Sequence, residues 1–180
     1  VFRQFSAPVK IQTDLTNDEL AFLMAHDSDG FNRWDAAQAL FIKEIQQAAD
    51  CLAADQDPEI SESLIQAFEK ALLTSSDDRA FFAKTLRLPQ EIELKDHFKP
   101  IDVDAIHQAR NFVKKQIAVQ LKEAFLNLAE QCSVPRQDPL SPAAVADRQL
   151  KNLSLSYLGS LQEPASLKLI EDMFRSADNI

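Results

Sequence analysis

Glycine is nearly absent from this chain: Gly30 and Gly159 are the only two among 180 residues. An average globular protein has about 7% glycine. Tight β-turns and the phosphate-binding loops of nucleotide folds depend on glycine, because it adopts positive φ without a steric penalty. Helices need no such residue, so the deficit favours an all-α fold.

Helix start signals divide most of the chain into successive segments. Thr16 followed by Glu19 has the spacing of a capping box, in which each side chain accepts a hydrogen bond from the other residue's backbone N–H. Short polar residues and prolines are favoured at helix starts, since they satisfy or omit the free N–H groups of the first turn. The predicted starts are Thr16, Asp29, Asp57-Pro58, Ser75 with Asp78, Asp102, Ser141-Pro142 and Pro164.

Apolar residues recur at helical spacing within these segments and predict the core. A helix from Gly30 to about Leu52 is expected to bury Trp34, and the longest helix is expected from about Val103 to Cys132. A short helical turn is expected at Gln90 to His97, and Gly159 has the position of a C′ residue that ends a helix. Further apolar residues at this spacing are Ile60, Leu64, Phe68, Leu72, Phe81, Phe82, Leu86, Leu150, Leu153 and Tyr157 or Leu158, and the last helix carries Leu167, Ile170, Met173 and Phe174.

These segments have no fixed repeat period, so TPR, HEAT and ankyrin templates are not supported. We predict an all-α fold, an irregular α-solenoid-like array of antiparallel helix pairs. Val1 to Ile11 differs, because its apolar residues lie among small or polar ones together with Pro8, which is typical of an edge strand or an extended linker. A lone strand leaves its hydrogen-bonding edge unpaired, so we expect the natural protein to continue upstream of Val1.

Charge and cysteine content restrict the partners and the compartment. The formal net charge is −9, which argues against a nucleic-acid or anionic-membrane surface. No apolar run reaches the length of a membrane span, and no signal segment stands at Val1. Cys51 and Cys132 lie far apart, so two buried thiols are favoured over a disulfide. A cytoplasmic location is expected.

Three blocks of sequence carry a family resemblance. They are Phe5-Ser6-Ala7-Pro8-Val9-Lys10, Leu20 to His26, and Phe31-x-Arg33-Trp34-Asp35-Ala36-Ala37-Gln38, with looser similarity through Leu86-x-Leu88-Pro89, Ile101-Asp102 and the region of Leu150. The chain resembles bacterial aminopeptidase N, a family of zinc peptidases that remove N-terminal residues from peptides. The similar region is where the β-sandwich domain of that family passes into its C-terminal helical, ARM-like domain.

The resemblance implies that this is a non-catalytic part of a larger zinc enzyme. Residues 1–14 would be the end of the β-sandwich or a linker, and residues 15–180 would be the first part of the helical domain. That domain would cover the catalytic domain of the same chain and restrict the access of peptide substrates. Zinc would be bound by the parent protein elsewhere in its chain. An interaction scaffold without any enzymatic activity remains the alternative.

The residues here do not supply the catalytic motif of such an enzyme. The three histidines are His26, His97 and His107, none is followed by Glu, and no two lie four apart, so HExxH is absent. Asp27-Ser28-Asp29-Gly30 lacks the end ligands of a calcium loop, so we interpret it as a turn capped by Asp29. His26 is interpreted as a helix C-terminal residue favoured by the helix dipole, and His107 as a surface residue. We therefore predict no catalytic, cofactor-binding or metal-binding residue in this chain.

An array that is cut midway exposes the apolar stripe of its last helix. We expect exposed apolar surface on the helix that starts at Pro164, and self-association through one or both ends.

Overall fold

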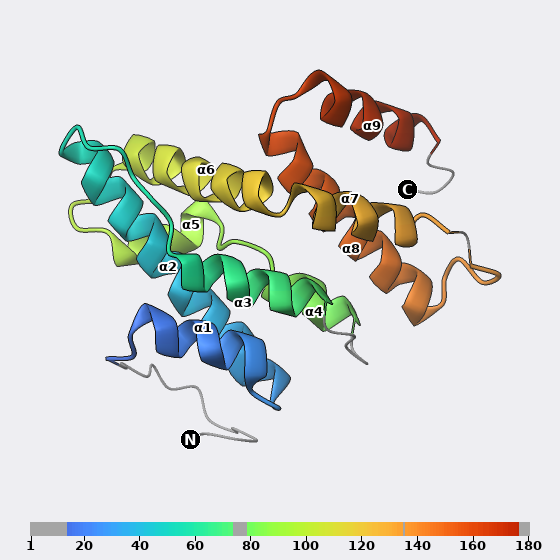
Figure 1. The fold of residues 1–180 in the computed structure, drawn as a ribbon, viewed down its shortest axis with the longest axis horizontal. Helices are drawn as coiled ribbons and strands as arrows, with labels where there is room; N and C mark the ends of the chain where they lie inside the picture. The colour runs from blue at the N-terminus through green and yellow to red at the C-terminus, as the bar shows by residue number, and fades with distance from the viewer. Residues whose placement is uncertain (1–13, 74–78, 135, 177–180) are drawn as a thin grey trace.

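The computed structural model describes residues 14–73, 79–134 and 136–176, and every element in these ranges is helical (Figure 1). The predicted all-α fold is therefore confirmed for the described residues. The predicted strand at Val1 to Ile11 and the predicted cap at Ser75 with Asp78 lie outside them. The helices are α1 (Asn17–His26), α2 (Gly30–Ala53), α3 (Glu62–Leu73), α4 (Arg79–Thr85), α5 (Glu91–Leu94), the short 3₁₀-helix η1 (Lys95–His97), α6 (Val103–Gln120), α7 (Lys122–Gln131), α8 (Pro142–Ser160) and α9 (Pro164–Arg175).

Most helix starts follow the capping signals of the sequence. Thr16 and Glu19 form the predicted capping box: Thr16 Oγ1 accepts from the Glu19 N–H at 3.2 Å, and Glu19 Oε2 accepts from the Thr16 N–H at 2.8 Å. The side chains of Asp29, Asp102 and Ser141 each accept from the backbone N–H three residues ahead. Each such cap stabilises a helix by about 1 kcal/mol.

The predicted start of α3 at Asp57-Pro58 is wrong, because the helix begins at Glu62. Ser61 is the residue that caps it, with its Oγ accepting from the Leu64 N–H at 3.3 Å. The buried Glu44 of α2 fixes this position, since its carboxylate accepts from both the Ser61 N–H (3.1 Å) and the Ser61 hydroxyl (2.5 Å). The contact with Glu44 on α2 thus selects Ser61, rather than Asp57, as the N-cap of α3.

The predicted long helix from Val103 to Cys132 is also wrong as a single element. It is interrupted at Leu121, whose φ of −113° and ψ of 23° are not helical, and the chain bends there between α6 and α7 (Figure 1). No glycine or proline marks the site. The two halves pack differently: α6 lies mainly against α2 and also against α8, whereas α7 lies mainly against α8. Tertiary packing therefore accounts for the break.

Gly159 does not end α8 as predicted. It lies inside the helix without a positive φ, and the left-handed residue of this turn is Gln162, with φ of 54°. A Cβ at Gly159 would stand 3.2 Å from Ile170 Cδ1, so the missing side chain lets α9 approach α8 closely.

Four aromatic rings from four helices meet at the centre of the core. Phe68 of α3 lies 6.1 Å from Phe41 of α2, 5.9 Å from Phe125 of α7 and 5.5 Å from Tyr157 of α8, measured between ring centroids. The rings of Phe125 and Tyr157 stack at 4.6 Å. The Tyr157 hydroxyl donates to the Leu86 carbonyl at 2.8 Å, and burial raises the pKa of that hydroxyl well above its usual value. We call these residues the four-ring core.

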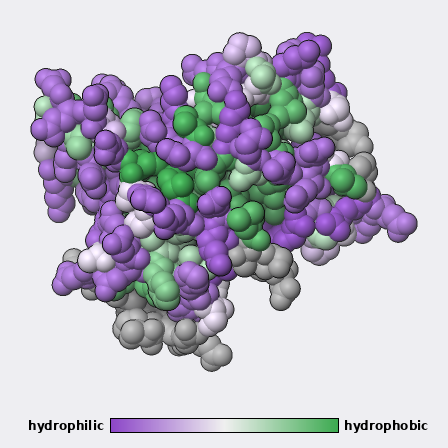
Figure 2. Space-filling view, viewed as in Figure 1, coloured by the Kyte–Doolittle hydropathy of each residue, from purple (hydrophilic) through white to green (hydrophobic). Residues whose placement is uncertain are grey.

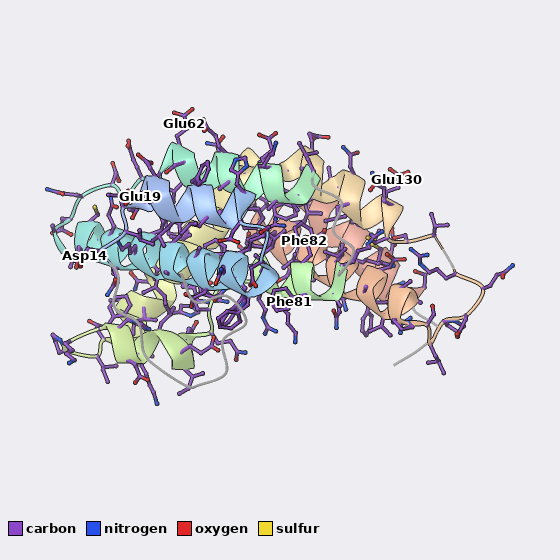
Figure 3. All side chains as sticks on the ribbon, turned by 90° about the horizontal axis from the view of Figure 1, so that it is seen from below. Asp14, Glu19, Glu62, Phe81, Phe82 and Glu130 are labelled. Atoms are coloured by element: carbon purple, nitrogen blue, oxygen red, sulfur yellow. The ribbon has the colours of Figure 1, made fainter. Side chains whose placement is uncertain are left out.

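The outer surfaces of α3 and α7 carry acidic side chains. Glu62 of α3 and Glu130 of α7 point away from the helices, whereas Phe82 of α4 is buried between them (Figure 3). The face in view carries hydrophobic residues in its middle and hydrophilic residues around them (Figure 2). Every helix of the described residues is too short or too polar to span a lipid bilayer.

Trp34 is not the core residue that the spacing predicted. It is only partly buried, near the start of α2, where its ring lies 5.6 Å from that of the exposed Phe31. The buried stripe of α2 begins later, at Ala36 and Ala37, and continues through Leu40.

α9 carries the exposed apolar surface that the sequence predicted. Leu167 is 49% exposed and Phe174 is 81% exposed, while Ser166 is the only residue of this helix that is fully buried. The helix packs against α8 along one side.

Candidate functional site

The histidines have ordinary structural positions. His26 is the last residue of α1, as expected, and its ring stacks on the exposed Phe22 at 4.8 Å. The carbonyl of His97 accepts from Gln46 Nε2 at 2.7 Å. His107 is an exposed residue of α6, with Nδ1 2.8 Å from Glu91 Oε1, so the predicted surface position is confirmed.

The turn at Asp27 to Gly30 is held by hydrogen bonds between its aspartate side chains and nearby backbone N–H groups. Asp27 Oδ1 accepts from the Asp29 N–H at 2.8 Å, and Asp29 Oδ1 accepts from the Asn32 N–H at 3.1 Å. The interpretation of a turn with Asp29 as N-cap is therefore confirmed. In the part of the chain that the structure describes, no three His, Cys, Asp or Glu side chains come together in a way that could hold a metal ion.

Cys51 and Cys132 are free thiols, so the disulfide alternative is excluded. Cys132 is buried as expected, but Cys51 is only partly buried. Burial is also the main reason why the pKa of the Cys132 thiol is raised, and it outweighs the nearby Arg79. A buried thiol with a raised pKa is a poor nucleophile.

A buried carboxylate with two arginines is the most distinctive polar feature. Asp147 of α8 is 6% exposed, and its Oδ2 accepts from Nε of Arg136, which lies in the loop between α7 and α8. Its Oδ1 lies 3.0 Å from Nη2 of Arg79 in α4, and the same nitrogen donates to Cys132 Sγ at 3.3 Å. We call Arg79, Cys132, Arg136 and Asp147 the Asp147 cluster.

The charges of this cluster support one another. The hydrogen bond and the negative charge of Asp147 raise the pKa of Arg136 above its usual value. The contact with Arg79 is ionic but not a hydrogen bond. Asp147 Oδ1 is buried and lies 3.0 Å from Arg79 Nη2, yet it accepts no hydrogen bond, so the two groups are less well aligned. Arg79 is therefore attracted by charge alone, while Arg136 is attracted by charge and by a directed hydrogen bond.

A pocket of about 420 Å³ opens beside the cluster. It is lined by Gln131, Val134, Arg136, Gln137 and Asp147. Arg136 is the one arginine among these lining residues, and its Nε already donates to Asp147 Oδ2, so the charged groups of the pocket form an ion pair. Sequence reasoning missed this site because Arg79 and Asp147 lie on different helices far apart in the chain, and neither residue belongs to a local motif.

A second buried carboxylate has no such opening. Glu44 is 1% exposed, and it accepts from Asn17 Nδ2 at 2.9 Å as well as from the backbone and hydroxyl of Ser61. These donors come from the start of α1 and the start of α3, so the role of Glu44 is to join three helices.

The fold defines an all-α array of the ARM type. Residues 17–180 match the family described as "Domain of unknown function (DUF3458_C) ARM repeats", and the chain belongs to this family.

Curated relatives add to this assignment. The chain is 33% identical to Aminopeptidase N of Haemophilus influenzae, 30% to that of Escherichia coli and 31% to that of Caulobacter vibrioides. These similarities cover 98%, 98% and 99% of this chain but only 20% of each relative. The resemblance to bacterial aminopeptidase N is therefore confirmed, and the chain spans about a fifth of the length of these relatives.

A solved structure has the same fold. The crystal structure of Legionella pneumophila aminopeptidase A in complex with aspartic acid superposes with a TM-score of 0.78 and 22% identity over 95% of this chain. The match covers 20% of that chain.

Proposed function

We propose that this chain is a non-catalytic helical part of a longer zinc-dependent aminopeptidase that removes N-terminal amino acids from peptides. The observation that carries the proposal is the similarity to Aminopeptidase N in three organisms, which extends over 98–99% of this chain. The chain corresponds to only 20% of each relative, which leaves room for a catalytic domain elsewhere in the same polypeptide.

The zinc of such an enzyme does not fit the residues described here. A catalytic zinc site needs three protein ligands with an open position. The described histidines lie on α1, η1 and α6 and each has its own local contacts, and no set of three ligand side chains gathers among the described residues. The metal would therefore be held by other parts of the longer protein.

If the metal is held elsewhere in the longer protein, the helical part has a non-catalytic role. Residues 15–180 would begin a helical domain that covers the catalytic domain and limits access to the active site, and residues 1–14 would connect it to a preceding β-sandwich. The location would be the cytoplasm. The alternative of an interaction scaffold without enzymatic activity is not favoured by any of the relatives, which are all named aminopeptidases.

The test compares the 180-residue chain with the natural full-length protein. The full-length protein is expected to hydrolyse alanyl or arginyl anilides, to lose activity with a chelator and to regain it with zinc. The chain alone is expected to be inactive and to retain no stoichiometric zinc after dialysis. A full-length protein without peptidase activity would refute the proposal, and so would turnover by the chain alone that persists through repeated purification.

A further inference from the structure

Lys114 of α6 is a lysine without an acidic partner. Its Nζ donates to the Ser156 hydroxyl of α8 at 2.8 Å, so the amine is held between two helices. Neither Lys114 nor Arg110, one helical turn before it, forms an ion pair with any residue that the structure describes. Lys122, by contrast, lies 2.5 Å from the carboxylate of Glu163. The ammonium form of Lys114 therefore lacks the counter-charge that an ion pair supplies.

The surroundings of Lys114 on α6 favour its neutral form. The side chain is partly buried, and burial is the main reason why the pKa of Lys114 is lowered. The positive charge of Arg110 lowers this pKa further, because two cations on one face of a helix repel each other. Arg110 is fixed in place, since its Nε donates to the Pro89 carbonyl at 2.7 Å.

The side of the site that α8 forms opposes this effect only weakly. Tyr157 is the titratable group of α8 that faces Lys114, and its raised pKa keeps it uncharged. The centroid of its ring lies 6.0 Å from Lys114 Nζ, at the outer limit of a cation–π contact. Ser156 is neutral and exposed, so the hydrogen bond between its hydroxyl and Nζ lies at the surface of the protein.

We propose that Lys114 is a site of acylation by activated carboxylic acids, such as acyl phosphates and esters with a good leaving group, and that it reacts faster than its neighbour Lys115. A lysine becomes a nucleophile when desolvation or a neighbouring cation increases its neutral fraction. While Nζ donates one N–H to Ser156 Oγ, its lone pair is free to react. The lone pair attacks the acyl carbon, the leaving group departs with its bonding electron pair, and one amine proton passes to water. The product is an amide, and the positive charge of Lys114 is lost.

The test is pulse labelling of the 180-residue chain with N-hydroxysuccinimidyl acetate, a neutral acyl donor. Peptide mass spectrometry, with fragmentation that separates the two positions, gives the rate at each lysine. Lys115 is the matched control, because it is the next residue of the same helix and is exposed. At about pH 7 we expect Lys114 to be acetylated at least roughly threefold faster than Lys115, although Lys115 is the more accessible amine. In urea the two rates should become equal, because both environments are lost.

The pH dependence separates reactivity from accessibility. The ratio of the rates at Lys114 and Lys115 should fall as the pH rises from about 7 to about 10, because the advantage of a lowered pKa disappears where both amines are neutral. A difference in accessibility alone would give a ratio that is independent of pH. A ratio of one or less at about pH 7, or a ratio that stays constant with pH, would overturn the proposal. Acetylation of the Ser156 hydroxyl in place of Lys114 would also overturn it.

Variants of two arginines test the cause. Arg110→Gln removes the neighbouring charge and should slow acetylation of Lys114 at about pH 7 at least roughly twofold, with a smaller effect on Lys115. Arg148→Gln is the matched control, since Arg148 lies on α8 and donates to the Pro139 carbonyl, and it should leave both rates unchanged. Equal effects of the two variants would mean that net charge, not the position of Arg110, sets the reactivity, and would overturn this part of the proposal.

The variants also have to fold, which far-UV circular dichroism checks. If Arg110→Gln does not fold, the pH dependence measured on the unaltered chain still decides the proposal. The reactivity of Lys114 does not depend on the proposed function, because labelling and peptidase activity are separate measurements.

Discussion

Replacing Phe68 by alanine should destabilise the protein more than any other single truncation of the four-ring core. Phe68 is fully buried and its ring contacts three others, those of Phe41, Phe125 and Tyr157. A buried Phe→Ala change costs about 3–5 kcal/mol, and each lost ring pair adds about 0.5–1.5 kcal/mol beyond its buried area. We therefore expect a loss near the upper end, about 5 kcal/mol. For a chain of this size about 1 kcal/mol shifts the melting temperature by about 2–4 °C, so the expected decrease is about 10–20 °C.

Urea and thermal melts followed by circular dichroism measure this loss. Phe68→Leu should retain more than half of the stability difference, because it keeps most of the apolar volume. Phe31→Ala is the matched control: Phe31 is 53% exposed, so its loss should cost about 1 kcal/mol or less. A loss of less than about 2 kcal/mol for Phe68→Ala, or equal losses at both positions, would refute the assignment of Phe68 as the centre of the core.

Further expected outcomes concern other contacts. Tyr157→Phe should cost about 1–3 kcal/mol in denaturant melts, because it leaves a buried carbonyl without its donor. Burial raises the pKa of Tyr157, the only tyrosine. The folded protein should therefore show no tyrosinate absorbance near pH 10, and the contribution of Tyr157 to stability should be constant below the unfolded pKa of about 10 and fall above it. Glu44→Gln should cost about 1–3 kcal/mol in the same melts, since charge-assisted hydrogen bonds to two helix starts are weakened. Trp34→Ala should cost about 1–2 kcal/mol, and iodide should quench Trp34 fluorescence partially, because the ring is only partly buried. Replacing Leu167 and Phe174 by serine should reduce self-association in light scattering while leaving the melting temperature unchanged.

Local signals predicted the fold well where the helix ends are determined locally. The capping box of Thr16 and the caps at Asp29, Asp102 and Ser141 need only residues three positions apart, so the sequence is sufficient to identify them. The start of α3 could not be predicted in this way, because Glu44 on another helix selects the cap.

The remaining errors have the same origin in long-range packing. The interruption at Leu121 has no local marker, and it accompanies a change of main partner, from α2 for α6 to α8 for α7. Gly159 has the sequence position of a terminator, but it lies inside α8 where a Cβ would crowd Ile170 of α9. The Asp147 cluster combines residues from α4, α8 and the loop between α7 and α8, so no window of sequence contains it.

The hydrogen bond from Tyr157 to the Leu86 carbonyl affects the order in which the helices of this array unfold. Repeat arrays in which each unit contacts only its neighbours can lose their terminal units one at a time. Here a side chain of α8 is bonded to the segment after α4, 71 positions away, and its ring also lies against Phe68 of α3. Opening the C-terminal helices would therefore remove contacts from the N-terminal half at the same moment. The amide protons of α2, α3, α7 and α8 should exchange with solvent at one common free energy, as a single cooperative unit, while those of α9 exchange earlier.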